Sequence, residues 1–227
     1  MLKRITEELK RHAPFTALGA ASGIAIMVII IFGNFLPQVS PISQNIFYIL
    51  HPTHVALSAV VTTAMYMRYG KRKIWAAILI GWTGSIGIAT ISDSLIPYLG
   101  EVLLELPNRG IHIGFIEKPL LTNSAAFLGI VLGYWGWSAK FITKFPHFGH
   151  VLISTWASLF HIIMALGVTV SWIQVIVILL FLFLAVWLLC CTSDIVYPLL
   201  FIGKKPKSCL PHSEDSKSSL AQSSEDS

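Results

Sequence analysis

Long runs of apolar residues, separated by short polar stretches, dominate the pattern along the chain. Six of these runs are long enough to cross the ~30 Å hydrocarbon core of a bilayer as helices, at about 1.5 Å per residue. Their approximate ranges are 15–35, 46–67, 74–99, 119–138, 150–170 and 172–202. Hydrophobic residues make up 55% of the chain and charged residues only 12%, which excludes an ordinary soluble domain. The pattern predicts an all-α polytopic membrane protein with six transmembrane helices.

The basic residues fall mainly on one side of this predicted arrangement. With the N-terminus in the cytoplasm, only Arg109 and Lys118 of the 16 Lys and Arg residues lie outside. The positive-inside rule therefore predicts two cytoplasmic termini, in a plasma membrane or an inner membrane. The formal charge of +5 then reflects contact with anionic lipid of the bilayer and not binding to nucleic acid. The sequence leaves open whether copies associate into a homo-oligomer.

A polar signature occurs twice along the chain. It consists of His-x-x-His-x-x-x-Ser followed by Ser-Asp-x-x-x-Pro, and the second copy repeats these motifs 96 and 101 residues later. The residues of the two copies are His51, His54, Ser58, Ser92, Asp93 and Pro97, then His147, His150, Ser154, Ser193, Asp194 and Pro198. A fainter match between 16–24 and 122–130 precedes them, with an offset of 106 residues. Three matches in the same order indicate an internal duplication.

The number of spans in each copy determines the expected symmetry. Three spans is an odd number, so the second copy must enter the membrane from the opposite side. We therefore expect two inverted-topology three-helix repeats, as in many transporters. The expected parts are a cytoplasmic interfacial segment 1–13, a first repeat 14–99, an outer linker 100–118, a second repeat 119–203 and a disordered cytoplasmic tail 204–227.

The histidines and serines of each copy share one helix face, because positions three and four apart are neighbours on a helix. The first His pair and Ser58 form one polar stripe, and the second pair, Ser154 and His161 form the other. The inverted arrangement predicts that the first pair lies toward the outer face with Asp93. It predicts that the second pair lies toward the inner face with Asp194.

The prolines of the two copies predict helix breaks. A helical residue donates its N–H to the carbonyl four residues earlier, and proline has no N–H to donate. Pro97 should therefore free the carbonyl of Asp93, and Pro198 that of Asp194. Each position would then offer a carboxylate, a free carbonyl and an adjacent serine to a cation.

Imidazole and carboxylate together are typical ligands of transition-metal ions such as zinc. Ionisable residues inside a span are functional-site candidates by default. The predicted metal ligands are His51, His54, Asp93, His147, His150 and Asp194, and the supporting polar path is formed by Ser58, Ser92, Ser154, His161 and Ser193. Histidine titrates near neutrality, which makes the proton the expected coupling ion. The sequence thus favours a transporter or permease for a divalent metal cation over an enzyme, with the cation as substrate or ligand and no cofactor certain.

The linker carries Glu101, Glu105, His112 and Glu117, which could collect cations at an outer mouth. The simpler interpretation, which we favour from the sequence, is that several of them are ordinary solvated loop residues.

Two other functions remain open. An intramembrane metal-dependent lipid hydrolase would use histidines, an Asp and a Ser around zinc, but it needs one site where the duplication predicts two. A haem-binding protein needs paired histidines at matching depth, and the two His pairs are expected at opposite depths. His161, which has Met65 at the corresponding position of the first copy, is the best argument for either alternative.

Overall fold

The computed structural model of the chain describes residues 2–70, 72–136, 141–166, 170–191 and 196–201, and for some helical residues, such as 141–148, only the backbone. Its long helices are α1 (Leu2–Phe32), α2 (Leu36–Tyr69), α3 (Ile74–Thr90), α6 (Pro119–Gly136), α7 (Phe141–Ala165) and α8 (Trp172–Cys191). The shorter ones are the π-helix η1 (Ile91–Leu95), α4 (Ile96–Leu103), α5 (Gly114–Glu117) and α9 (Tyr197–Leu200). The described residues contain no strand, which confirms the predicted all-α class.

Three helices in the described part of the chain are long and apolar enough to cross a membrane. They span 36–69, 74–103 and 172–189, and the second of them consists of α3, η1 and α4 together. Two shorter apolar helices span 17–32 and 149–165. Residues 2–13, which we expected to form a separate segment, continue into α1 as one helix. The predicted tail 204–227 lies outside the described residues.

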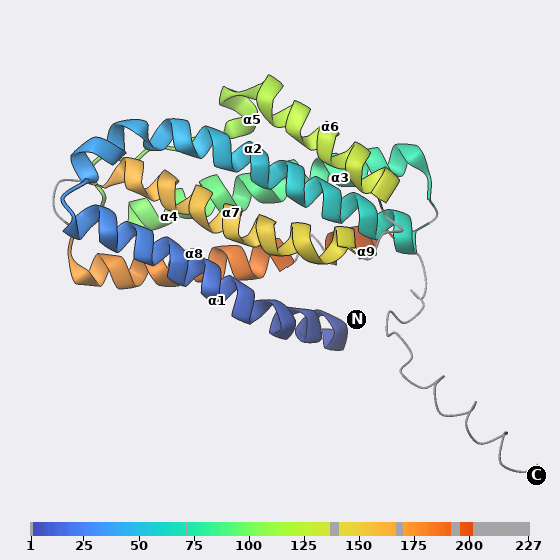
Figure 1. The fold of residues 1–227 in the computed structure, drawn as a ribbon, viewed down its shortest axis with the longest axis horizontal. Helices are drawn as coiled ribbons and strands as arrows, with labels where there is room; N and C mark the ends of the chain where they lie inside the picture. The colour runs from blue at the N-terminus through green and yellow to red at the C-terminus, as the bar shows by residue number, and fades with distance from the viewer. Residues whose placement is uncertain (1, 71, 137–140, 167–169, 192–195, 202–227) are drawn as a thin grey trace, which may run out of the picture.

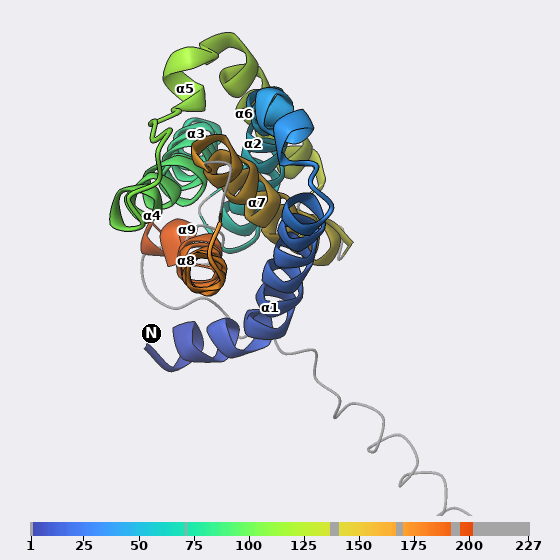
Figure 2. The same ribbon diagram turned by 90° about the vertical axis from the view of Figure 1, so that its left-hand side faces the viewer.

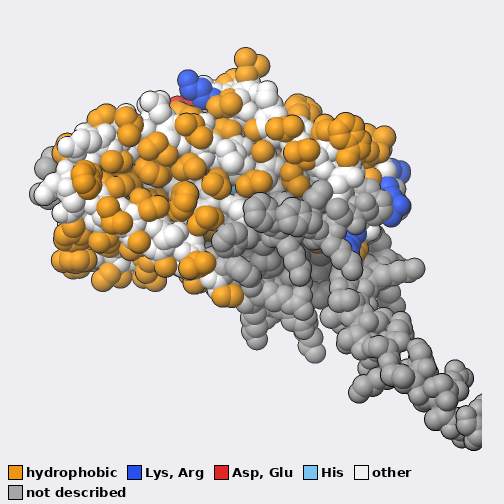
Figure 3. All heavy atoms as spheres, viewed as in Figure 1, with side chains coloured by type: hydrophobic (Ala, Val, Ile, Leu, Met, Phe, Trp, Pro, Cys, Tyr) orange, Lys and Arg blue, Asp and Glu red, His pale blue; other side chains and the backbone are white. Residues whose placement is uncertain are grey.

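Apolar side chains cover much of the face of the bundle that Figure 3 shows, and many large apolar side chains of the described residues are exposed. On α8, for example, Ile173 is 73% exposed, and Ile176 and Leu180 are also exposed. Soluble monomers rarely expose apolar patches larger than a few hundred Å². This surface, together with the long apolar helices, is that of a helical membrane protein.

The long helices run back and forth along the long axis of the molecule (Figure 1). α2 ends and α3 begins at one end of the bundle, where Arg68, Arg72 and Lys73 are exposed; we call it the basic end. At the opposite end α4 leads into residues 104–118, which include α5; we call it the linker end.

α2 and α7 form the centre of the bundle (Figure 2). They pack against each other, and α2 also packs against α6 and α3, while α7 packs against α1 and α8. The outer helices pair in a matching way, α3 with α6 and α8 with α1. Most of the buried polar side chains of the described chain belong to α2, α7 and the π-helix η1.

Small residues allow the outer helices to approach the central ones closely. A Cβ added at Gly129 of α6 would lie 2.2 Å from the carbonyl oxygen of Ala56 and 2.7 Å from the Ala59 Cβ. On the other side of the bundle, Gly23 of α1 faces Thr155 of α7. The small-residue positions therefore mark helix contacts, as expected where packing drives helix association in lipid.

Candidate functional site

Asp93 lies at the centre of a buried polar cluster. Its side chain is inaccessible to solvent and accepts four hydrogen bonds. The Nδ1 atoms of His51 and His54 lie 3.0 Å and 2.7 Å from Oδ2, and the Oγ atoms of Ser92 and Ser154 lie 2.7 Å and 2.8 Å from Oδ1. These partners come from α2, η1 and α7, so the cluster joins both halves of the chain.

The spacing of the two histidines explains how one carboxylate oxygen binds both. His51 and His54 are three residues apart on α2, so they project from neighbouring positions on one helix face. Both are essentially fully buried, as is Ser58 one turn further along. The structure thus brings together His51, His54 and Asp93, which the sequence placed in one predicted site.

The helix around Asp93 widens instead of breaking. Residues 91–95 form a π-helix, in which the N–H of Ile96 donates to the carbonyl of Ile91, five residues earlier. The predicted break between Asp93 and Pro97 was therefore wrong in form. π-turns of this kind occur mostly within α-helices and often at functional sites.

The π-turn immediately precedes Pro97, so it bears on which carbonyl the proline leaves without a donor. If the five-residue register continues by one position, Pro97 would pair with the carbonyl of Ser92 and not with that of Asp93. The Oγ of Ser158 on α7 lies 3.1 Å from this Ser92 carbonyl oxygen and 2.9 Å from the Ser154 carbonyl oxygen of its own helix, so its one proton is shared between them. A side chain from the other half of the chain thus lies within hydrogen-bond distance of a carbonyl next to Asp93, and the freed Asp93 carbonyl stays a prediction.

His150 of the second copy also reaches this cluster. Its ring is fully buried and contacts the ring of His54 edge-on, with centroids 5.1 Å apart. The expectation that the two His pairs lie at opposite depths was therefore wrong for these two residues. His54 is one turn further than His51 from the linker end, and His150 is one turn further than His147 from the basic end. Because α2 and α7 are antiparallel, these two residues meet.

The remaining residues of the second copy are only partly described. The side chain of His147 in α7 and all of Ser193 and Asp194 lie outside the described residues. Pro198 is buried in α9. The predicted break between Asp194 and Pro198 therefore also lies outside the described chain.

A second buried carboxylate, Glu101 of α4, binds His161 of α7. Both side chains are fully buried, and Nδ1 of His161 lies 2.7 Å from Oε1 of Glu101. The Oε2 of Glu101 accepts the backbone N–H of Gly110 at 3.2 Å, and Nε2 of His161 accepts the backbone N–H of His112 at 3.4 Å. Glu101 is thus a buried, paired residue, and its interpretation as a solvated loop residue was wrong.

The ring of Phe47 lies in contact with both histidine clusters. It stacks on His51 with centroids 5.3 Å apart and meets His161 edge-on at 5.4 Å. Phe47 is fully buried. An apolar ring therefore separates the Asp93 cluster from the Glu101–His161 pair.

The linker covers His51. A Cβ added at Gly114 of α5 would lie 2.4 Å from Cδ2 and 2.8 Å from Nε2 of the His51 ring, so only glycine permits this approach. Thr122 holds the Gly114 carbonyl at 3.0 Å. The hydroxyl of Tyr48 donates to Glu117, which also lies 3.4 Å from Nδ1 of His112. These contacts fix the linker against α2.

The donor atoms do not form a metal site in this structure. Among the described residues, no group of three or more His, Cys, Asp or Glu side chains is arranged to hold a metal ion. A carboxylate can only accept, so the Nδ1 atoms of His51 and His54 both carry a proton toward Asp93. In this structure Asp93 thus accepts hydrogen bonds from both imidazoles, and its role as a metal ligand stays a prediction.

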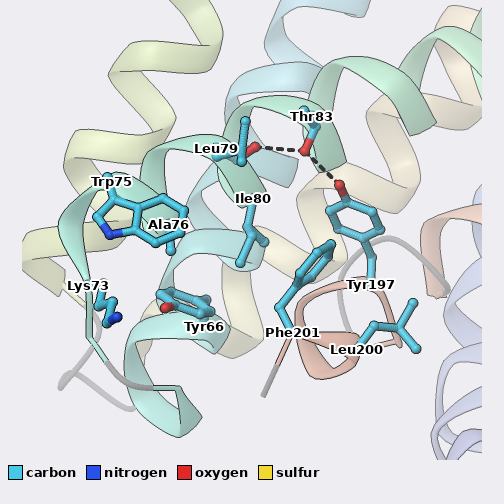
Figure 4. Close-up of a pocket in the computed structure, with 10 residues that line it drawn as sticks. All are labelled: Tyr66, Lys73, Trp75, Ala76, Leu79, Ile80, Thr83, Tyr197, Leu200 and Phe201. Atoms are coloured by element: carbon cyan, nitrogen blue, oxygen red, sulfur yellow. Dashed lines mark hydrogen bonds between the residues drawn. The ribbon is translucent and has the colours of Figure 1, made fainter. Parts of the chain in front are cut away.

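A pocket of about 560 Å³ lies at the basic end, apart from both clusters (Figure 4). Within it the hydroxyls of Thr83 and Tyr197 lie 2.6 Å apart. It is lined by Tyr66, Lys73, Trp75, Ala76, Leu79, Ile80, Thr83, Tyr197, Leu200 and Phe201. None of the predicted site residues lines this pocket.

No sequence pattern singled out Phe47, Tyr48 or Gly114 as site residues, and none paired Glu101 with another residue. The one signal that could have paired Glu101 was His161, a second intramembrane ionisable residue without a counterpart in the first copy.

Fold and site together define a class: a helical membrane protein that buries two carboxylate–imidazole clusters between its central helices. Comparison of the chain with protein-family models, curated proteins and solved structures finds no match.

Proposed function

We propose that this protein is a membrane transporter that exchanges a divalent transition-metal cation, such as zinc, for protons. The observation that carries the proposal is the buried Asp93 carboxylate, which binds Nδ1 of both His51 and His54. With Nδ1 protonated, the lone pair of a neutral imidazole is on Nε2. A carboxylate on the far nitrogen is the usual way in which proteins orient a metal-binding histidine and raise its basicity.

The surroundings of the imidazoles support the same proposal. The Nε2 of His51 is buried and has no hydrogen-bond partner among the described residues. A buried ring nitrogen of this kind is costly unless it serves a ligand. The cation ligands would be His51, His54 and His150, which brings a third imidazole from the second half to the ring of His54.

Competition for the imidazole nitrogen explains why protons would be the exchanged ion. An ionised Asp93 beside one protonated imidazole is neutral overall, which suits a low-dielectric bundle. A divalent cation bound through Nε2 requires neutral imidazoles, so its arrival expels that proton. Histidine exchanges protons readily near neutral pH.

The proposed architecture is six membrane spans in two inverted three-helix repeats. Two glycine contacts support it: Gly23 faces Thr155, and Gly129 faces Ala59. These glycines are 106 residues apart, and Ala59 and Thr155 are 96 apart, the same offsets that relate the repeated sequences. The helix contacts show the same correspondence between the two halves. The α2–α6 contact corresponds to α7–α1, and the α3–α6 contact corresponds to α8–α1.

The proposed setting is a plasma or inner membrane with both termini in the cytoplasm. The basic end, with Arg68, Arg72 and Lys73 exposed, would face the cytoplasm, and the linker end would face outside. The partners are then the lipid bilayer and the cation.

Zinc flux into vesicles reconstituted with the full chain, loaded with zinc-sensitive and pH-sensitive dyes, tests the proposal. Zinc entry should drive proton exit, and His54→Ala should reduce the flux at least about tenfold, since even orienting residues behind a metal ligand contribute roughly 10–100-fold. The matched control is His112→Ala, which removes a linker histidine and should retain the flux. Absence of zinc flux from the native chain would refute the proposal, and zinc-dependent lipid hydrolysis in its place would identify a hydrolase.

A further inference from the structure

The hydrogen bonds of His161 admit only one protonation state. Its Nδ1 donates to Glu101 at 2.7 Å, and its Nε2 accepts the backbone N–H of His112 at 3.4 Å. A neutral ring with its proton on Nδ1 satisfies both contacts. A doubly protonated ring carries N–H on both sides, so Nε2–H would face another N–H.

A second proton on His161 would therefore break the contact with the linker while keeping the contact with Glu101. The titratable groups that face the ring are Glu101 from α4 and His112 from the linker, whereas α2 presents the ring of Phe47. The Glu101 carboxylate offsets the added charge in a fully buried position. A second proton on the ring would thus keep the contact with Glu101 and act as a repulsion on the backbone N–H of His112.

The part of the linker held by His161 is also the part that covers His51. His112 is two residues from Gly114, whose backbone leaves no room for a side chain beside the His51 ring. Glu101 holds the same segment through the N–H of Gly110. One short stretch, residues 110–118, therefore joins the two clusters.

We propose that Glu101 and His161 form a second proton-binding site, and that its protonation releases residues 110–118 and opens His51 to the linker end of the bundle. This inference rests on the proposed function, because the released segment would admit the cation to His51 and His54. It gives the exchanged proton a separate place to act, away from the cation ligands.

The test measures release of the linker directly, without transport. A cysteine replaces Ile113, which is partly buried, or Ile116, which is 68% exposed, in the otherwise native chain in vesicles. A membrane-impermeant methanethiosulfonate labels each variant, and mass spectrometry of the labelled peptide separates it from the native cysteines. The ratio of the two labelling rates cancels the effect of pH on thiol reactivity.

The ratio for Ile113→Cys over Ile116→Cys should rise about tenfold as the pH falls from about 8 to about 5.5, across the range of histidine. With His161→Gln added, the ratio should stay low at every pH, because a Gln amide can donate to Glu101 and accept from His112 without gaining a proton. With His112→Gln added instead, the rise should remain, since the contact uses the His112 backbone.

A pH response that survives His161→Gln would overturn the inference, and one lost only in His112→Gln would assign the switch to the His112–Glu117 pair. Unchanged labelling of Ile116→Cys shows that the His161→Gln chain is folded. If it is not folded, His161→Asn serves as the second uncharged variant and should give the same flat ratio. A native pH response in a chain without zinc flux would retain the switch and refute only the transport proposal.

Discussion

The two buried carboxylates of this protein bind histidine in the same way but differ in what surrounds the pair. Asp93 receives Nδ1 atoms from two imidazoles and hydroxyls from two serines, all of them side chains on helices. Glu101 receives one imidazole, and both its free oxygen and the far side of His161 bind backbone N–H groups of the linker.

In the function that we propose, this difference separates the site that binds the cation from the site that controls access to it. At the Asp93 cluster the far nitrogen of His51 is unpaired among the described residues, so it can take a ligand. At the Glu101 cluster the far nitrogen of His161 is already occupied by the segment that covers the first cluster. In this proposal the same chemical pair orients cation ligands at Asp93, which we call the platform, and holds the linker at Glu101, which we call the latch.

The largest expected effect is the difference in zinc affinity between a variant without the Asp93 charge and one without the Glu101 charge. Asp93→Asn should lower zinc affinity about 10–100-fold, because the two imidazoles lose the group that orients them and offsets the cation. Glu101→Gln removes the same charge from the other cluster and should leave zinc affinity within about threefold. Calorimetric titration of the purified full chain with zinc measures both.

Equal losses of zinc affinity in Asp93→Asn and Glu101→Gln would show that the two clusters act as one site. That result would remove the distinction between platform and latch.

A smaller effect is expected at the cover that links the clusters. Gly114→Ala places a methyl group against the His51 ring and should cost about 1–3 kcal/mol of unfolding free energy. The matched control is Gly87→Ala on α3, where an added Cβ meets nothing within 4 Å. That change should be neutral or stabilising by up to about 1 kcal/mol, because alanine favours the helix.

Denaturant titration of both glycine variants in detergent measures the two free energies. A Gly114→Ala protein as stable as Gly87→Ala would mean that the linker does not press on His51, and the latch would then have nothing to cover.

The sequence predicted the class of the fold and the part of the Asp93 cluster that consists of His51, His54 and Asp93. Apolar runs are a direct consequence of helices surrounded by lipid, so they predict the helical class well. The grouping of His51 and His54 follows from spacing within one helix. Asp93 could be added because the inverted arrangement gave it a comparable depth.

The rest depends on how separate helices meet, which a single sequence does not encode locally. Proline predicts a helix break, but the chain forms a π-turn at Asp93, in which the N–H of Ile96 donates to the carbonyl of Ile91, five residues earlier. The contact of His54 with His150 depends on where α2 and α7 cross. Glu101 looked like a loop residue because its partner, His161, is 60 residues away in sequence.

An effect of about 1 kcal/mol is expected where α7 supports the helix around Asp93. Ser158→Ala removes a hydroxyl that bonds to Ser154 in its own helix and also reaches the Ser92 carbonyl of η1, so that buried acceptor loses this donor. The control, Ser85→Ala, removes a hydroxyl of equal burial that bonds only within its own helix, to Trp82. Denaturant titration should show the larger loss for Ser158→Ala; the reverse order would mean that the π-turn needs no support from α7.

The smallest effect is expected at the partly exposed rim of the latch. Tyr48→Phe removes the hydroxyl that donates to Glu117, whose side chain is 35% exposed, so water can replace most of the lost bond. The labelling rate of Ile113→Cys at neutral pH should rise only about twofold, because His161 and Glu101 still hold the linker. Tyr197→Phe, which removes a hydroxyl contact at the basic end, should leave that rate unchanged. A rise in Tyr48→Phe as large as the one caused by acid would instead place the latch at Glu117, on the surface, and would leave the buried Glu101–His161 pair without control over the linker.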